Sequence, residues 1–400
     1  MRLNSKISTP ARTVKARFSS LILPWRAGLN RPMRRIAALL CGILLGTAVF
    51  AVSASHAVVK IEGPRIPAPN FPTAKIWINS KPLTLKQLRG KVVLIDFWDY
   101  TCINCIRTFP HLERWNRLYG PLGLVIIGVH TPEFDFAKNV NLVREAVKRF
   151  GITYPVAIDN DGKIWDAFHN PGWPTEYLID SKGRIVERHL GEGDYDLTEM
   201  LIQSLLKEAN PSLSFKAAKY RVTEDERQYG GACLRTTRET YLGTLRDLNI
   251  SNKGNLVKDK LHVYAAPKPV PIDTAALQGP WMAHGDGIHT DASVGKSRSQ
   301  VLLHYRAKSV YMVAGSDNGT PRRVYITQDG KPITRNARGL DVKADASGKT
   351  YIELGQRRMY YVVNNRDFGK HLLAVSTTDP GVGLYSFTFG NNCEPNFAHK

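Results

Sequence analysis

A Cys-x-x-Cys motif lies between a buried strand and a helix, and this arrangement constrains the fold more than any other feature. Residues 91–98 read Lys-Val-Val-Leu-Ile-Asp-Phe-Trp, a nearly continuous apolar run typical of a strand covered on both faces. Cys102 and Cys105 follow shortly after this run. The apolar residues beyond the motif recur every three positions, which predicts a helix with one buried stripe. They are Ile106, Phe109, Leu112, Trp115 and Leu118.

Strands and helices continue to alternate as far as residue 209. The patterns predict further strands at 124–129, 154–158, 176–180 and 185–190, and helices at 136–150 and 197–209. The last two strands are close enough in sequence to form a hairpin. An alternating series that ends in a hairpin favours a mixed sheet with helices on both faces. We therefore expect an α/β domain with a central mixed sheet over residues 58–209.

The periodicity changes after a short linker at residues 210–218. Apolar residues now alternate with polar ones, as they do at Val301, Leu303 and Tyr305. Turn signals such as Asp329-Gly330 separate the alternating segments. Several short strands at this spacing predict an all-β antiparallel sandwich, jelly-roll-like, over residues 219–400.

The first 57 residues have the composition of a targeting segment. They contain nine Lys or Arg and no acidic residue, and they end in an apolar run at 36–52. Small residues at Ser55 and Ala57 complete the pattern of a secretory signal cleaved after Ala57. An uncleaved membrane anchor is the alternative, and Met33 is an alternative start. Either interpretation predicts an exported protein of the periplasm or cell envelope.

The positive net charge does not by itself indicate a nucleic-acid partner. The chain carries a formal charge of +20, which falls to +11 without the nine basic residues of the predicted signal. The remaining basic residues are not clustered with aromatic ones as in a nucleic-acid-binding module. We therefore expect a protein of the cell envelope that binds no nucleic acid.

The cysteine motif predicts thiol–disulfide exchange. Cys102 falls at the helix start, where free backbone N–H groups and the helix dipole favour a thiolate. Cys105 lies one turn further in and would resolve the mixed disulfide. Asp96, on the preceding strand in apolar surroundings, is the candidate proton acceptor for Cys105. Trp98 is expected to pack beneath the motif.

Two other interpretations of the motif are weaker. A structural zinc site needs four ligands, and the sequence has no second Cys-x-x-Cys. Covalent haem attachment needs a histidine after the second cysteine, where this chain has Ile106. We therefore expect no metal and no cofactor other than the redox-active disulfide Cys102–Cys105 itself.

Residues from three other segments are candidates for the same site. Pro174, in Gly-Trp-Pro-Thr, precedes a strand and is a candidate cis-proline; together with Trp173 and Thr175 it would bind the substrate chain beside the sulfur. His130 and Glu133 follow the second buried strand and could tune Cys102. Solvated loop residues are the simpler interpretation of these last two.

The quoted motifs resemble those of thioredoxins. Asp96-Phe97-Trp98, the Cys-x-x-Cys and Pro110 repeat the thioredoxin active-site pattern at the same spacing. Residues 98–105, 130–134 and 191–195 more specifically resemble the C-terminal part of DipZ-type proteins, in the TlpA-like branch of periplasmic thioredoxins. The resemblance implies a reductase of protein disulfides, a separate membrane electron donor of the CcdA or DsbD kind, and a carbohydrate-binding-module-like second domain.

The second domain leaves several possibilities open. Cys233 and Cys393 lie near its two ends, so they could form a stapling disulfide or remain surface thiols. The domain could bind a glycan or a protein, or act as a spacer. An envelope binding protein with a passive cysteine pair is therefore the alternative function. A thiol peroxidase is less favoured, because Thr101 stands one residue before Cys102 rather than three.

Overall fold

The computed structural model describes residues 64–69, 74–215, 234–246, 249–254 and 256–391. The chain divides into two units, 1–54 and 55–400, and every described residue lies in the second. The predicted signal and its cleavage point therefore fall outside the described residues. Among the residues that are described, no helix is both long and apolar enough to cross a membrane.

The first domain is built on a mixed sheet of seven strands, in the order β1-β7-β6-β3-β4-β5-β2. β3, β4 and β5 run parallel to one another, and the other pairings are antiparallel. The strands are β1 (Ile66–Pro67), β2 (Trp77–Ile78), β3 (Val92–Trp98), β4 (Leu124–His130), β5 (Val156–Ile158), β6 (Thr175–Ile179) and β7 (Arg184–Leu190). The apolar run of residues 92–98 is the central strand β3, so the predicted thioredoxin-like sheet is confirmed.

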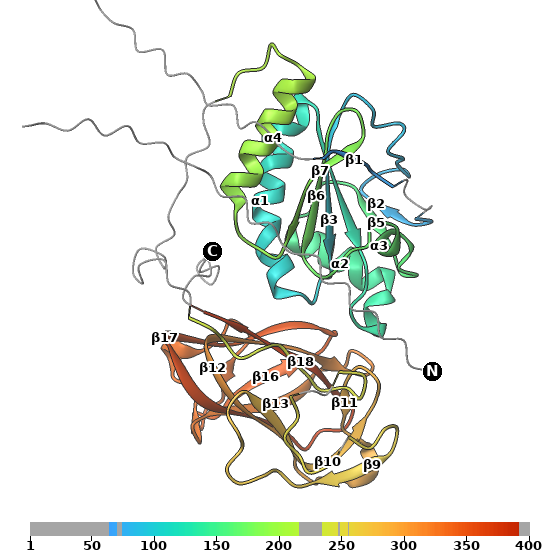
Figure 1. The fold of residues 1–400 in the computed structure, drawn as a ribbon. Helices are drawn as coiled ribbons and strands as arrows, with labels where there is room; N and C mark the ends of the chain where they lie inside the picture. Colours follow the sequence, from blue (N-terminus) through green and yellow to red (C-terminus); the bar gives the residue numbers. More distant parts are fainter. Residues whose placement is uncertain (1–63, 70–73, 216–233, 247–248, 255, 392–400) are drawn as a thin grey trace, which may run out of the picture. The chain divides into compact units, whose positions relative to one another are not determined.

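Four helices accompany this sheet (Figure 1). They are α1 (Ile103–Tyr119), α2 (Val140–Phe150), α3 (Lys163–Ala167) and α4 (Tyr195–Ala209). In Figure 1, α1 and α4 lie side by side along the sheet. Residues of α1, α2 and α4 share one core with Leu94 of β3, whereas Ile164 of α3 packs on the other face with Ile95. Helices therefore cover both faces, as the alternating pattern predicts.

Two helices differ in detail from the sequence-based prediction. The helix expected from residue 136 begins at Val140, because the Asn139 side chain accepts a hydrogen bond from the Asn141 backbone N–H and caps the helix there. Phe136 belongs instead to a short 3-10 turn, Asp135–Lys138. The helix α3 was not predicted, because its five residues are too short to show a helical period.

The second domain is all-β and every pairing between its strands is antiparallel, as predicted. Its longest strands are β10 (Thr274–Ala283), β12 (Ser299–Ser316), β17 (Arg358–Thr377) and β18 (Val382–Gly390). β12 pairs with both β10 and β18, and β11 (Ile288–His289) joins those two. Strands β10, β11, β12 and β18 therefore close into a small barrel. The outer strands are β8 (Thr240–Tyr241), β9 (Leu261–Tyr264), β13 (Arg322–Gln328), β14 (Lys331–Pro332), β15 (Lys343–Ala344) and β16 (Thr350–Leu354).

Three large aromatic side chains of this domain belong to its core. Trp281, Tyr305 and Tyr360 are each no more than 2% exposed. They pack in the same apolar cluster as Phe387. A buried ring presents no face to a sugar, so these three side chains serve the core and not a glycan site.

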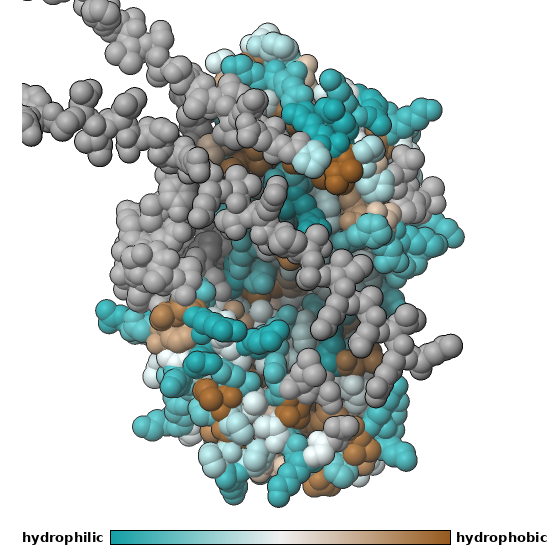
Figure 2. Space-filling view, viewed as in Figure 1, coloured by the Kyte–Doolittle hydropathy of each residue, from teal (hydrophilic) through white to brown (hydrophobic). Residues whose placement is uncertain are grey.

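On the face drawn in Figure 2, hydrophobic residues lie in small separate groups among hydrophilic ones. A surface of this kind is ordinary for a folded domain. The described residues on this face therefore present no single broad apolar patch.

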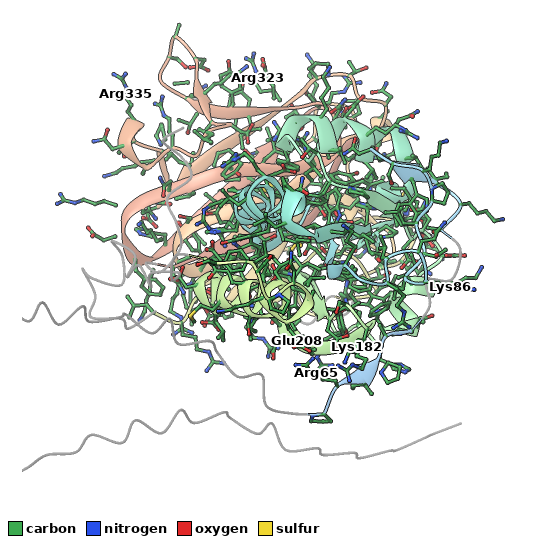
Figure 3. The ribbon with its side chains drawn as sticks, turned by 90° about the horizontal axis from the view of Figure 1, so that it is seen from above. Arg65, Lys86, Lys182, Glu208, Arg323 and Arg335 are labelled. Atoms are coloured by element: carbon green, nitrogen blue, oxygen red, sulfur yellow. The ribbon has the colours of Figure 1, made fainter. Side chains whose placement is uncertain are left out.

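Arg65 ties the first described segment to the rest of the α/β domain. Its guanidinium lies 2.7 Å from Glu208 of α4 and 3.1 Å from Asp180, which follows β6. Figure 3 shows Arg65 beside Glu208 at the edge of the domain. We expect Arg65→Ala to lower the free energy of unfolding by at most about 1 kcal/mol, because both partners of the Glu208 pair reach solvent. Urea denaturation measures this, and a loss that did not shrink at high salt would contradict the ionic explanation.

Candidate active site

The two motif cysteines occupy the first turn of α1. Cys102 is the N-cap residue, with extended backbone angles of φ −80° and ψ 110°. Its Sγ accepts a hydrogen bond from the Cys105 backbone N–H at 3.3 Å. Cys102 is partly exposed, Cys105 is buried, and both are free thiols. The outer sulfur is therefore the accessible one, and the inner sulfur lies behind it, as the spacing predicts.

Asp99 fixes the loop that carries Cys102. One carboxylate oxygen accepts hydrogen bonds from the backbone N–H and the hydroxyl of Thr101, both at 2.7 Å. The other accepts from the Glu133 backbone N–H at 2.8 Å, in the segment after β4. A buried carboxylate satisfied in this way joins the ends of two neighbouring strands. Asp99 therefore holds the nucleophile's loop against the loop of residues 131–134.

Burial dominates the electrostatics of both thiols. It raises the pKa of Cys102, against the hydrogen bond from Cys105, and nearby Glu133 and Glu239 act in the same direction as burial. The pKa of Cys105 is raised still further, again chiefly by burial. The helix start alone predicted a favoured thiolate at Cys102. The structure differs, because desolvation of the sulfur outweighs the hydrogen bond at the helix start.

Asp96 lies in β3, fully buried, on the face of the sheet that α1 covers. Neither of its carboxylate oxygens has a hydrogen-bond partner among the described residues. Burial, and then the charge of Glu176, raise the pKa of Asp96 well above its ordinary value. The same carboxylate contributes to the raised pKa of Cys105, so the two groups are electrostatic neighbours. Its role as proton acceptor remains a prediction.

Glu176 stands directly opposite Asp96 on the neighbouring strand β6. Directly opposed residues of an antiparallel pair project to the same face with their Cβ atoms about 5 Å apart. Burial raises the pKa of Glu176 to about 7. The site therefore contains a pair of buried carboxyl groups where the sequence analysis expected one.

The segment of residues 172–175 lies at the start of β6. The peptide bond between Trp173 and Pro174 is cis. The Trp173 indole N–H donates to the Thr131 carbonyl oxygen at 3.1 Å, and the Thr175 hydroxyl donates to the Gly172 carbonyl oxygen at 2.7 Å. These bonds fix the segment against the loop that follows β4. The substrate-binding role of Trp173, Pro174 and Thr175 remains a prediction.

His130 is buried and uncharged. Its ring lies 5.0 Å from the Trp98 ring and 5.7 Å from the Tyr100 ring, between centroids. Burial lowers the pKa of His130 to about 3, although its Nε2 is 3.7 Å from a carboxylate oxygen of Asp99. A neutral imidazole in this packing supports Trp98 and the loop. It does not tune Cys102 by charge near neutral pH.

Glu133 is held by residues of the second domain. Its Oε1 accepts hydrogen bonds from the Tyr241 hydroxyl at 2.5 Å and from Arg246 at 3.0 Å. The Tyr241 hydroxyl is also 2.8 Å from Glu239. Phe134, beside Glu133, packs in a cluster with Tyr385 of β18. The second domain therefore contacts the loop after β4, which is the loop that Asp99 joins to the nucleophile.

Arg107 is a buried arginine on α1 that positions the dipeptide between the cysteines. Its guanidinium donates to the Asn104 side-chain oxygen at 3.1 Å and to Glu192 at 2.8 Å. The same group lies over the Tyr311 ring, 5.1 Å from its centroid. Only 2% of its side chain is exposed. A buried cation with these partners fixes Asn104 relative to the turn after β7.

Comparison with known proteins identifies the family. A family model described as redoxin matches residues 65–201, and one described as thioredoxin like C-terminal domain matches residues 237–390. Thiol-disulfide oxidoreductase ResA of Bacillus anthracis is 33% identical over 144 residues, which are 36% of this chain and 77% of ResA. The chain belongs to the thioredoxin-like family of thiol-disulfide oxidoreductases.

Two longer relatives extend the match of this oxidoreductase into the second domain. Protein DipZ of Mycobacterium bovis is 38% identical over 270 residues, which are 67% of this chain and 37% of DipZ. SUPPRESSOR OF QUENCHING 1 of Arabidopsis thaliana is 36% identical over 286 residues, 70% of this chain and 26% of that protein. The predicted resemblance to DipZ and TlpA-like proteins is confirmed. The chain spans little more than a third of DipZ.

Sequence reasoning missed three residues of this oxidoreductase site. Glu176 could have been found, because a single acid in an otherwise apolar strand two residues after Pro174 is unusual. Arg107 and Asp99 gave no such signal, because charged residues beside a motif are ordinary in a sequence. Cys233 and Cys393 lie outside the described residues. Within the described part of the chain, no group of three His, Cys, Asp or Glu residues could hold a metal ion.

Proposed function

We propose that this oxidoreductase is an exported reductase of protein disulfides. The observation that carries the proposal is the arrangement of the two sulfurs. Cys102 is partly exposed at the N-cap of α1, and Cys105 is buried one turn behind it. The signal-like composition of residues 1–57 supports export to the periplasm or envelope, an oxidising location where protein disulfides occur.

The reaction would proceed by two exchanges of a disulfide bond. Cys102 loses its proton and attacks one sulfur of the substrate, whose disulfide breaks and releases a thiolate that takes up a proton. Cys105 then transfers its proton to Asp96 and attacks the Cys102 sulfur of the mixed disulfide. The second substrate sulfur leaves as a thiolate. Two electrons pass to the substrate, and the protein retains the Cys102–Cys105 disulfide.

The substrate chain would bind beside the segment of residues 172–175. β6 itself is paired with both β3 and β7, so only the Trp173 backbone just before it would offer a short edge, held rigid by the Trp173 and Thr175 hydrogen bonds. An extended peptide can pair with such an edge through main-chain hydrogen bonds. Recognition of backbone rather than side chains would suit a reductase that acts on many disulfides.

The reducing direction is favoured by the resemblance to TlpA-like proteins, and the raised pKa of Cys102 supports it. A dithiol is a strong oxidant when the protein stabilises its reduced, thiolate form. Burial of Cys102 does the opposite, because it disfavours the anion. The oxidised protein would then need a reductant, and the family resemblance favours a membrane donor of the CcdA or DsbD kind.

The reduction potential of the Cys102–Cys105 couple tests this direction. We expect a value near thioredoxin's, about −270 mV, from equilibration of the full chain with a glutathione or dithiothreitol buffer. Cys102→Ser serves as the control, because it lacks the Cys102–Cys105 couple and reports only the contribution of the other cysteines. A value near about −120 mV would identify an oxidant and contradict the proposal.

A further inference from the structure

Three proton-exchanging side chains form a row across three adjacent strands. Asp96 of β3 is paired in register with Glu176 of β6. Glu176 is in turn paired with His189 of β7. Directly opposed residues of antiparallel strands project to the same face, so all three lie on the face that α1 and α4 cover. The row runs from the centre of the sheet, beside Cys105, toward its edge.

Exposure to solvent increases along this row. Asp96 is 0% exposed and Glu176 is 4% exposed. His189 is partly exposed, and its buried Nε2 atom has no hydrogen-bond partner among the described residues. The innermost group is thus sealed from water, and the outermost one reaches it.

Other titratable groups face the row from the elements packed against it. Tyr154 feels the charges of both Asp96 and Glu176, and Tyr195 of α4 feels that of Glu176. His111 of α1 stacks on Tyr195 with 3.6 Å between ring centroids. Burial lowers the pKa of His111 to about 4 and raises that of both tyrosines, so none of these three exchanges a proton near neutral pH. Other charged neighbours include Glu187 on β7, Glu192 beyond it, and Glu113 and Arg107 on α1.

The proposed function creates a problem that this row can solve. When Cys105 is deprotonated, Asp96 receives the proton in a position with no exposed surface. Because the pKa of Asp96 is raised, Asp96 must first lose a proton to solvent before it can accept the proton of Cys105 and allow the mixed disulfide to be resolved. Water has no direct access to Asp96, but Glu176 lies opposite it on the neighbouring strand, at a separation that a single bridging water can span.

We propose that Asp96, Glu176 and His189 form a path that carries the proton of Cys105 to solvent at the β7 side of the sheet. The inference rests on the proposed function and extends it. Cys105 passes its proton to the Asp96 carboxylate, and Asp96 passes it to the Glu176 carboxylate. Glu176 gives it to the unpartnered Nε2 of His189, and the imidazole releases a proton to water from its other nitrogen. Asp96 and Glu176 return to their starting states, His189 ends as its other neutral tautomer and must return to the first before the next transfer, and no electron moves along the row.

The electrostatics of Glu176 suit this role. Burial raises the pKa of Glu176 to about 7, so both protonation states are populated near neutral pH. A proton carrier works best when its pKa is close to the working pH. Glu176 and His189 act on the reaction only through Asp96, since neither touches a sulfur in this arrangement.

Decay of the mixed disulfide in single-turnover experiments tests the path. The full chain, reduced, is mixed with a disulfide peptide, and formation and decay of the adduct are followed by rapid acid quench from pH 5 to 9. We expect Glu176→Gln to leave adduct formation unchanged and to slow its decay at pH 7 by about tenfold. The variant should also lose the inflection near neutral pH in the decay profile. Glutamine keeps the shape of the side chain and carries no exchangeable acid proton.

The outer end of the path is tested separately at the edge strand. We expect His189→Ala to slow decay several-fold and added imidazole to restore it. Arg188→Gln is the matched control, because Arg188 is the next residue on β7 and projects to the opposite face. It should decay like the wild type.

The outcomes separate the path from the proposed function. Wild-type decay rates in Glu176→Gln at every pH, or a His189→Ala defect that imidazole does not relieve, would overturn the path while leaving the reductase intact. Failure of the wild-type protein to form any adduct would overturn the proposed function itself. If the adduct of Glu176→Gln decayed slowly but its pH profile kept the inflection near neutral pH, the slow decay would come from a structural change, and the path would also be overturned.

Discussion

Replacement of Cys102 by serine is expected to abolish disulfide reduction, and replacement of Cys105 by serine is expected to trap the protein on its substrate. Cys102 carries the accessible sulfur, so Cys102→Ser removes the nucleophile and should lower the rate by about a thousandfold or more. Cys105→Ser keeps the nucleophile but removes the group that resolves the adduct. The two variants should therefore fail at different steps.

Insulin reduction and non-reducing gels distinguish these steps. We expect no insulin precipitation with either variant, and a dithiothreitol-sensitive adduct with Cys105→Ser alone. The double variant is the control, and it should form no adduct. Thermal unfolding should change little in Cys102→Ser and shift down by a few degrees in the two variants that replace the buried Cys105, because a hydroxyl is more costly to bury than a thiol. Full insulin reduction by Cys102→Ser would contradict the assignment of Cys102 as the nucleophile. An adduct formed through Cys105 in that variant would mean that Cys105, and not Cys102, attacks the substrate.

The order of the elements around the site could be predicted because it is local in sequence. The apolar run ending at Trp98, the Cys-x-x-Cys and the helical stripe all lie within about thirty residues, and each pattern has one structural solution. The N-cap position of Cys102 followed from these. The change of period after residue 210 likewise predicted the antiparallel strands of the second domain.

What could not be predicted depends on contacts between distant residues. Glu176 is opposite Asp96 only because β6 pairs with β3 in one particular register. The bond from Tyr241 to Glu133 joins positions 108 residues apart, and no periodicity reports such a pair. The raised pKa of Cys102 has the same origin, since it reflects burial by the complete fold rather than the helix start.

The second large effect that we expect concerns stability. Glu176→Gln should raise the free energy of unfolding at pH 8 by about 3 kcal/mol and leave it nearly unchanged at pH 4. The reason is the raised pKa of Glu176, about 7 against an ordinary value of 4.5. Burial penalises the ionised carboxylate, and glutamine is neutral at every pH.

The sign follows from proton binding. Between pH 4.5 and 7 the folded protein keeps a proton on Glu176 that the unfolded chain has lost, so wild-type stability falls as the pH rises through this interval. Above pH 7 the penalty is complete and constant. Below pH 4.5 the side chain is neutral in both states, which is why the variant and the wild type should converge there.

Urea titrations at pH 4, 6 and 8 measure the effect. Glu145→Gln provides the control, since Glu145 is exposed on α2 and its variant should follow the wild type within about 0.5 kcal/mol. The buried pair makes the experiment sharp, because Asp96 remains in the variant and has lost the neighbour whose charge raises its pKa. Ionisation of Asp96 should therefore be easier in the variant. In addition, the variant buries no charge at position 176. An equal response of the wild type and Glu176→Gln to pH would mean that Glu176 is ionised without penalty, and the buried carboxyl pair would no longer explain how the site handles its proton.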